Sequence, residues 1–146
     1  MGQKAYRLCL PDVDMSLQTN IDEVIQKIQD ERQRGRQVLI WVSLPCTCWC
    51  QWQFVNKAIA EQNGAEALDA FQTNLNKERN ESRVLLDGFV KVLIAATKLG
   101  AFVAFEWTAY NTGWHEPKMQ TVMQLLPYVA LVDGCQLGMQ DPEGSQ

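Results

Sequence analysis

The residue types best suited to chemistry gather in one short segment, residues 45–53, which holds three cysteines, two tryptophans and two glutamines. Thiolates act as nucleophiles and metal ligands, and tryptophan rings stack on flat ligands. We therefore predict a site here. Its ligand-binding residues within this segment are Pro45, Thr47, Trp49, Gln51 and Trp52.

Three interpretations of the cysteines stay open. In the first, Cys46 is a nucleophile that is activated at a strand end by the start of a following helix. Alternatively, Cys46, Cys48 and Cys50 hold a soft metal, with Cys135 or His115 as a fourth ligand. In the third, the thiols and indoles only pack the loop onto a sheet. Because zinc knuckles usually separate their first two cysteines by more than one residue, we assign no metal ligand.

A second group of candidates follows later in the chain. Glu106 ends an apolar stretch, where a carboxylate often has a functional role, although it would also be stable there if it reached water. Trp107 and Trp114 offer a stacking wall for a flat ligand such as a base, and packing in the core or at an interface is the alternative. We predict Cys46 and Glu106 as catalytic residues, and Trp107 and Trp114 as ligand-binding residues.

Two strands must position these groups. Residues 38–44 are almost unbroken apolar sequence, typical of a parallel strand covered on both faces. Residues 101–106 form a second apolar strand. Ligands bind beyond the carboxyl ends of such strands, so the segment 45–53 and Glu106 are expected to open onto the same edge of one sheet.

Helices are expected between and around these strands. Asn20 resembles the cap of a helix that runs to Gly35, and a long helix ends at Lys98. Segments 54–59 and 66–75 read as helical or irregular, and a further helix starts at Pro117. Strands are also expected at 6–10 and 128–132.

This alternation predicts one α/β domain over residues 1–146, Rossmann-like, with a mostly parallel sheet and crossover helices. The polar tail 141–146 is expected to fray. Neither a Gly-x-Gly-x-x-Gly nor a phosphate-binding Gly-Lys-Ser/Thr motif occurs, which disfavours standard dinucleotide and nucleoside triphosphate sites.

Composition narrows the class further. A net charge of −4 disfavours binding of a nucleic-acid backbone by the whole surface, and we interpret the basic residues 32–36 as a solvated helix end. No apolar run reaches the roughly 18 residues of a membrane span. The N-terminal sequence does not look like a secretory signal, and five cysteines are an odd number, so we expect reduced thiols and a cytoplasmic location.

Residues 38–53, a long helix and then Phe105-Glu106-Trp107 resemble the middle of a cytosine-C5 DNA methyltransferase domain. The resemblance implies that Cys46 attacks the base and that Glu106 holds the cytosine ring. A closer likeness, over residues 36–139, is to uncharacterised related domains of protist and phage mobile-element proteins, which share the segment Cys135-Gln136-Leu137-Gly138. The chain lacks the family's glycine-rich cofactor loop and has Trp107 in place of asparagine, so we assign no cofactor.

Three functional hypotheses follow. The first is a methyltransferase-related domain that binds a nucleobase or another small ligand in a pocket at the carboxyl ends of the strands. The second is a protein-binding or self-assembly module, in which the tryptophans pack against a partner or against a second copy in a homo-oligomer. The third is a small cysteine-based metal or redox protein.

Overall fold

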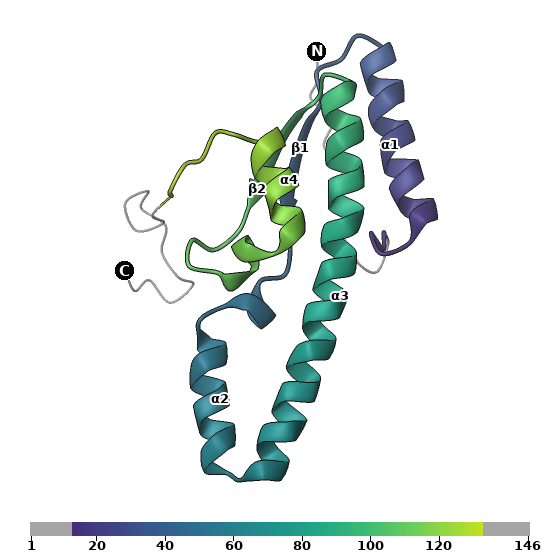
Figure 1. The fold of residues 1–146 in the computed structure, drawn as a ribbon. Coiled ribbons are helices and arrows are strands. Elements are labelled where there is room, and N and C mark those ends of the chain that lie inside the picture. The colour runs from purple at the N-terminus through teal and green to yellow at the C-terminus, as the bar shows by residue number, and fades with distance from the viewer. Residues whose placement is uncertain (1–12, 133–146) are drawn as a thin grey trace, which may run out of the picture.

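The computed structural model of this chain describes residues 13–132. Within that range the chain forms helices and strands in the order α1 (Gln18–Gln33), β1 (Leu39–Ser43), η1 (Thr47–Trp49), α2 (Trp52–Gln62), α3 (Ala65–Lys98), β2 (Phe102–Glu106), η2 (Thr112–His115) and α4 (Pro117–Leu125), where η marks a 3-10 helix. Figure 1 shows α3 running the length of the molecule, with α1 beside its upper half and α2 beside its lower half.

The two strands lie side by side and run parallel, with Leu39 opposite Phe102 and Ser43 opposite Glu106. The chain passes from β1 to β2 through α2 and α3. The α/β class, with parallel strands joined by a helical crossover, is therefore confirmed for the described residues. Both strands end at the same edge, as the sequence predicted.

Helices cover one face of this sheet. Ile40 and Val103 pack against a cluster formed by α1 and α3, and Val42 and Phe105 pack against a second cluster formed by α3 and α4. The opposite face, which we call the open face, is exposed: Leu39 is 66%, Trp41 67% and Phe102 61% accessible. The prediction of a strand covered on both faces is wrong for the described residues, because α1, α3 and α4 all contribute to the same side.

The start of α1 also differs from the prediction. The helix begins at Gln18 and Leu17 occupies the capping position. Asn20 lies inside the helix, where its side-chain amide donates to the backbone oxygen of Asp14 at 2.9 Å. This bond holds the preceding segment against the helix, so Asn20 stabilises the entry to α1 without capping it.

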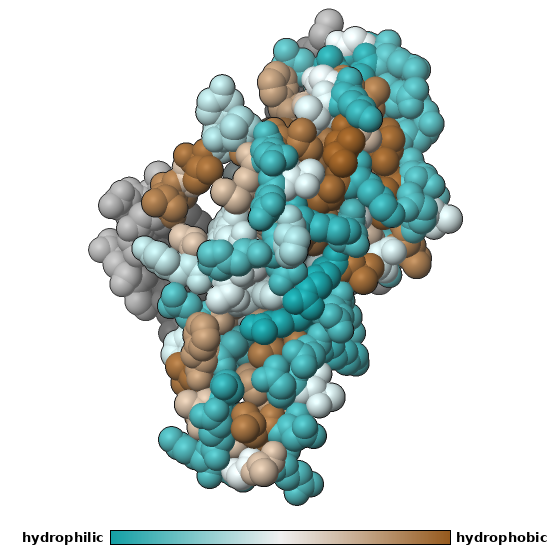
Figure 2. All heavy atoms as spheres, in the orientation of Figure 1, coloured by the Kyte–Doolittle hydropathy of each residue, from teal (hydrophilic) through white to brown (hydrophobic). Residues whose placement is uncertain are grey.

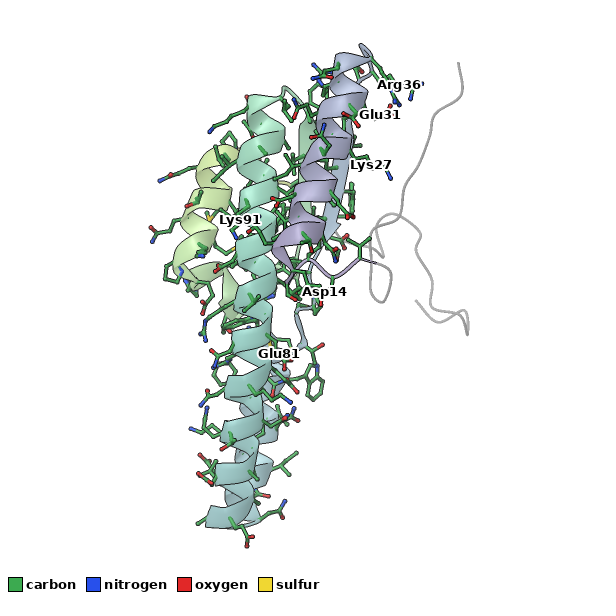
Figure 3. The ribbon with its side chains drawn as sticks, turned by 90° about the vertical axis from the view of Figure 1, so that its right-hand side faces the viewer. Asp14, Lys27, Glu31, Arg36, Glu81 and Lys91 are labelled. Carbon is green, nitrogen blue, oxygen red and sulfur yellow. The ribbon has the colours of Figure 1, made fainter. Side chains whose placement is uncertain are left out.

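The basic cluster at the other end of α1 is used within the fold. Arg32 donates to the backbone oxygen of Leu99 at 2.9 Å and so ties α1 to the end of α3. Arg34 and Arg36 both form ion pairs with Glu31. Figure 3 shows Glu31 and Arg36 together at this end of the helix. These contacts agree with the interpretation of the cluster as a helix end.

Helix α3 is longer than predicted. The segment 66–75 and the predicted long helix that ends at Lys98 belong to one helix of 34 residues, about 51 Å long at the standard rise. It ends where Gly100 takes a positive φ of 70°, a conformation that favours glycine. Although α3 is long enough to cross a membrane, it contains many charged residues. No helix between residues 13 and 132 is both long and apolar enough to do so.

The predicted strand at 128–132 is not formed. This stretch has no helix or strand assignment, and its apolar side chains, Tyr128, Val129, Leu131 and Val132, are between 71% and 96% exposed. Residues that favour strands form one only where a neighbouring strand accepts their hydrogen bonds, and neither β1 nor β2 pairs with this stretch. The predicted strand at 6–10, the tail at 141–146 and the segment with Cys135 lie outside the described residues.

Candidate functional site

Two segments meet at the carboxyl ends of the strands. The indole N–H of Trp107, just after β2, donates to the backbone oxygen of Leu44, just after β1, at 3.1 Å. The hydroxyl of Thr112 donates to the backbone oxygen of Trp49 at 2.9 Å. The cysteine-rich loop and the segment after β2 are therefore joined at one edge of the sheet.

Trp49 anchors η1 to α3. Its side chain is only 4% exposed, and its indole N–H donates to the hydroxyl of Ser82 at 2.8 Å. The guanidinium carbons of Arg79 and Arg83 lie 5.1 and 5.2 Å from its ring, within the range of cation–π attraction. The ring of Trp49, predicted to bind a ligand, is packed in the core in this structure and has almost no surface open to one.

The three cysteines lie in different environments. Cys48 is buried beside Trp49, whereas Cys46 and Cys50 are half-buried. The thiol of Cys50 approaches the backbone oxygen of Thr47 at 3.0 Å. Among the described residues, no three histidine, cysteine or carboxylate side chains are placed to hold a metal, and His115 sits exposed at the end of η2. The geometry of residues 13–132 therefore does not favour the metal interpretation.

Burial raises the pKa of the Cys48 thiol, and Glu78 nearby acts in the same direction. We expect iodoacetamide to label Cys48 at least about tenfold more slowly than Cys46 in the native protein, because only the exposed thiolate reacts. Pulse labelling followed by peptide mass spectrometry measures both rates. Because the folded state favours the neutral form of the Cys48 thiol, the stability that this preference contributes is complete below the ordinary thiol pKa. That contribution is lost as the pH rises through the raised pKa of the folded state.

In urea, which exposes both thiols, the labelling rates of Cys48 and Cys46 should become similar. Equal rates in the native protein would show that Cys48 is not buried and that the contact between η1 and α3 is wrong.

Aromatic rings pack at the carboxyl ends of the strands, on the face of the sheet that the helices cover. Phe105, Trp107 and Trp114 form mutual edge-to-face contacts with centroids 5.6 to 5.8 Å apart. The indole N–H of Trp114 donates to the backbone oxygen of Thr108 at 2.8 Å. Both tryptophans are half-buried and their N–H groups are bonded within the chain. These bonds hold the segment after β2 in place, and the predicted ligand-binding role of the two rings stays a prediction.

Asn111 completes this support. It is 3% exposed, and its side-chain oxygen accepts from the backbone N–H of Gly113 at 2.7 Å. That bond fixes which end of the amide is oxygen, and the Nδ2 group has no hydrogen-bond partner in the described part of the chain. Gly113 is buried against the Trp107 ring, where a Cβ atom would lie 2.3 Å from Cη2. Any side chain at residue 113 would therefore force the Trp107 ring to move.

The open face of the sheet carries a different pair at the same edge. Glu106 is exposed, and its Oε2 atom accepts from the indole N–H of Trp41 at 3.3 Å. Trp41 itself is 67% exposed. A carboxylate and a large aromatic ring thus lie together on an accessible surface.

The sequence alone does not single out Trp41, because the apolar run 38–44 predicts burial on both faces of the sheet. The signal that would have found it is the alternation of side chains along a strand, which puts Trp41 on the same face as Ser43. Ser43 pairs with Glu106 in the sheet.

The remaining predicted residues divide into two groups. Pro45 and Thr47 are exposed beside the strand ends, and Cys46 is half-buried between them. Gln51 and Trp52 are also exposed but stand at the start of α2, which runs away from the sheet (Figure 1).

The two best-formed hollows among residues 13–132 lie away from this edge. One hollow lies beside β2 and is lined in part by Thr97, Phe102 and Tyr128. Another lies between Arg83 and Lys118. Neither hollow is lined by a predicted site residue. We therefore describe the candidate site as an open surface around Trp41 and Glu106.

No protein-family model, no curated protein and no solved structure matches this chain. The likeness to methyltransferases therefore stays a prediction, and the function has to be argued from the geometry of the site.

Proposed function

We propose that this chain is a Rossmann-like, methyltransferase-related domain that binds a flat, nucleobase-like ligand on the open face of its sheet. The observation that supports this most is the contact between Trp41 and Glu106. An exposed indole donates at 3.3 Å to an exposed carboxylate, at the strand edge where ligands bind in α/β sheets.

The two side chains offer complementary interactions to such a ligand. Stacking of a base on an aromatic ring contributes about 1–3 kcal/mol, and the ring of Trp41 has free surface for it. A carboxylate accepts hydrogen bonds from the amino group of a base such as cytosine. Within residues 13–132 the Glu106 carboxylate accepts a hydrogen bond at Oε2 alone, which leaves acceptor positions for a ligand.

Cys46 lies just after β1, the strand that carries Trp41, and is half-buried near the carboxyl ends of the strands. If the domain is catalytic, Cys46 is the nucleophile and Glu106 the carboxylate that holds the ring, as the resemblance implies. The proposal itself concerns binding alone. Three free thiols, Cys46, Cys48 and Cys50, favour a reducing compartment such as the cytoplasm.

The test is the affinity of the protein for cytidine, measured by isothermal titration calorimetry. We expect Trp41→Ala to weaken binding at least about tenfold through loss of stacking. Glu106→Gln should weaken it by about tenfold, because a hydrogen bond to a charged acceptor is replaced by a neutral one. Phe102→Ala is the matched control, since Phe102 is 61% exposed on the same face at the other end of β2, and this variant should bind as the wild type does.

A second control changes the ligand. Fully N-methylated uracil is flat but has no N–H donor, so it cannot use the Glu106 carboxylate. It should bind more weakly than cytidine to the wild type, and its affinity for the Glu106→Gln variant should equal its affinity for the wild type. The proposal is contradicted if cytidine binds with the same affinity to the wild type, Trp41→Ala and Glu106→Gln, or if none of the proteins binds it at millimolar concentration.

A further inference from the structure

Helix α2 exposes an apolar surface that the proposed function does not use. Its outer face consists of Trp52, Phe54, Val55 and Ile59, which are 69%, 65%, 45% and 51% accessible. The charged residues of α2, Lys57 and Glu61, lie 3.4 Å apart and pair with each other. The two opposite charges therefore offset each other beside the outer face. Figure 2 shows apolar side chains, in brown, in the lower part of the molecule, where α2 lies.

The inward side of α2 is more polar than this outer face. Ala60 is its only buried residue. Gln53 is half-buried and donates to the backbone oxygen of Thr47 at 2.9 Å. A surface helix normally buries its apolar stripe and exposes its polar one. In α2 this arrangement is reversed, which indicates that the outer face is covered by something beyond the described chain.

The helical hairpin of α2 and the first turns of α3 also lacks a core of its own. Helix α3 has no buried residue before Leu75, and α2 contributes only Ala60. Figure 1 shows this hairpin extending below the sheet, with no other described element against it. Short helices in water are marginally stable without tertiary packing. A second apolar surface would supply the burial that this hairpin is missing.

We infer that the outer face of α2 pairs with the same face of a second copy of this chain. Trp52, Val55 and Ile59 follow one another at spacings of three and four residues and so form one stripe. When two such stripes meet antiparallel around Val55, the large Trp52 of one copy meets the smaller Ile59 of the other. That match is self-complementary, as a two-fold interface requires. Two hairpins joined in this way form a four-helix bundle.

The available area fits this occupant. Given the typical area of a buried aromatic side chain, the exposed parts of Trp52 and Phe54 amount to roughly 300 Å². Val55 and Ile59 add about half as much again, which gives a patch as large as the largest one on a typical monomer, and such patches are often functional. A stable interface buries about 800 Å² per partner. The outer face supplies about half of this area, and the polar residues around it can supply a rim.

Sedimentation velocity over a range of protein concentrations tests the inference. The wild type should show a reversible monomer–dimer equilibrium. Val55→Glu should raise the dimer dissociation constant at least about 30-fold, because the symmetric contact would bury two unpaired carboxylates. Val84→Glu is the matched control, since Val84 is also a helical valine of nearly the same exposure, 47% against 45%. This control should dimerise as the wild type does.

Circular dichroism of both variants verifies that each is folded before comparison. A wild type that stays monomeric at all concentrations overturns the inference. So does a Val55→Glu variant that dimerises like the wild type, or a Val84→Glu variant that is equally impaired. The inference does not depend on ligand binding at Trp41 and Glu106, so either can fail alone.

Discussion

Replacement of Trp49 by alanine is expected to lower the free energy of unfolding by about 3–5 kcal/mol, the usual cost of removing a large buried aromatic side chain. Trp49 is 4% exposed and packs with Cys48 and Leu75. The substitution also leaves the Ser82 hydroxyl without its 2.8 Å partner, in a residue that is itself buried. Urea denaturation followed by circular dichroism measures the change.

Trp41→Ala is the control for this large effect. It removes the same side chain from a position that is 67% exposed, so we expect a loss of less than about 1 kcal/mol. Similar losses for the two variants would contradict the placement of Trp49 in the core and of Trp41 on the surface. The comparison also shows whether Trp41→Ala is stable enough for the binding experiment.

Gly113→Ala should lower the free energy of unfolding by about 2–4 kcal/mol, a large effect for one added methyl group. Its Cβ atom would lie 2.3 and 2.7 Å from two atoms of the Trp107 ring and 2.9 Å from the side-chain oxygen of Asn111. Relief requires the indole to move, and with it the bond from Trp107 to Leu44 that joins the two strand ends. The stability should be measured by urea denaturation, as for Trp49→Ala.

A double-mutant cycle identifies the cause of this loss. The two clashing atoms, Cη2 and Cζ3, belong to the outer ring of the indole, which phenylalanine lacks. In a Trp107→Phe background, Gly113→Ala should therefore cost at least about 1 kcal/mol less than it does in the wild type. Equal costs in both backgrounds would show that the Trp107 ring is not what limits residue 113.

Much of the fold was predictable because its local signals agree. The apolar runs became β1 and β2, and Gly100 ends α3 with a positive φ. Pro117 starts α4, as its fixed φ and missing N–H favour. Segment 128–132 carries the same kind of apolar signal but forms no strand, because strand formation depends on a partner and not only on local preference.

The side chains of the site were harder to predict, because periodicity does not reveal which face of a strand is covered. Trp41 sits in an apolar run that suits burial, and only the placement of the helices on the other face exposes it. Trp49 looked accessible as part of a loop, yet Ser82, 33 residues away in the chain, holds it in the core. Such contacts depend on how α3 packs, which the loop sequence alone does not contain.

The most direct test of the proposed function is to follow the tryptophan indole N–H resonances in heteronuclear NMR spectra while cytidine is added. The Trp41 resonance is assigned from the spectrum of a Trp41→Phe variant. We predict a saturable shift of the Trp41 resonance, with that of the buried Trp49 nearly unchanged. If Trp41 does not shift at cytidine concentrations on the order of 10 mM, which would reveal even very weak binding, the open face does not bind a nucleobase and the proposal is wrong.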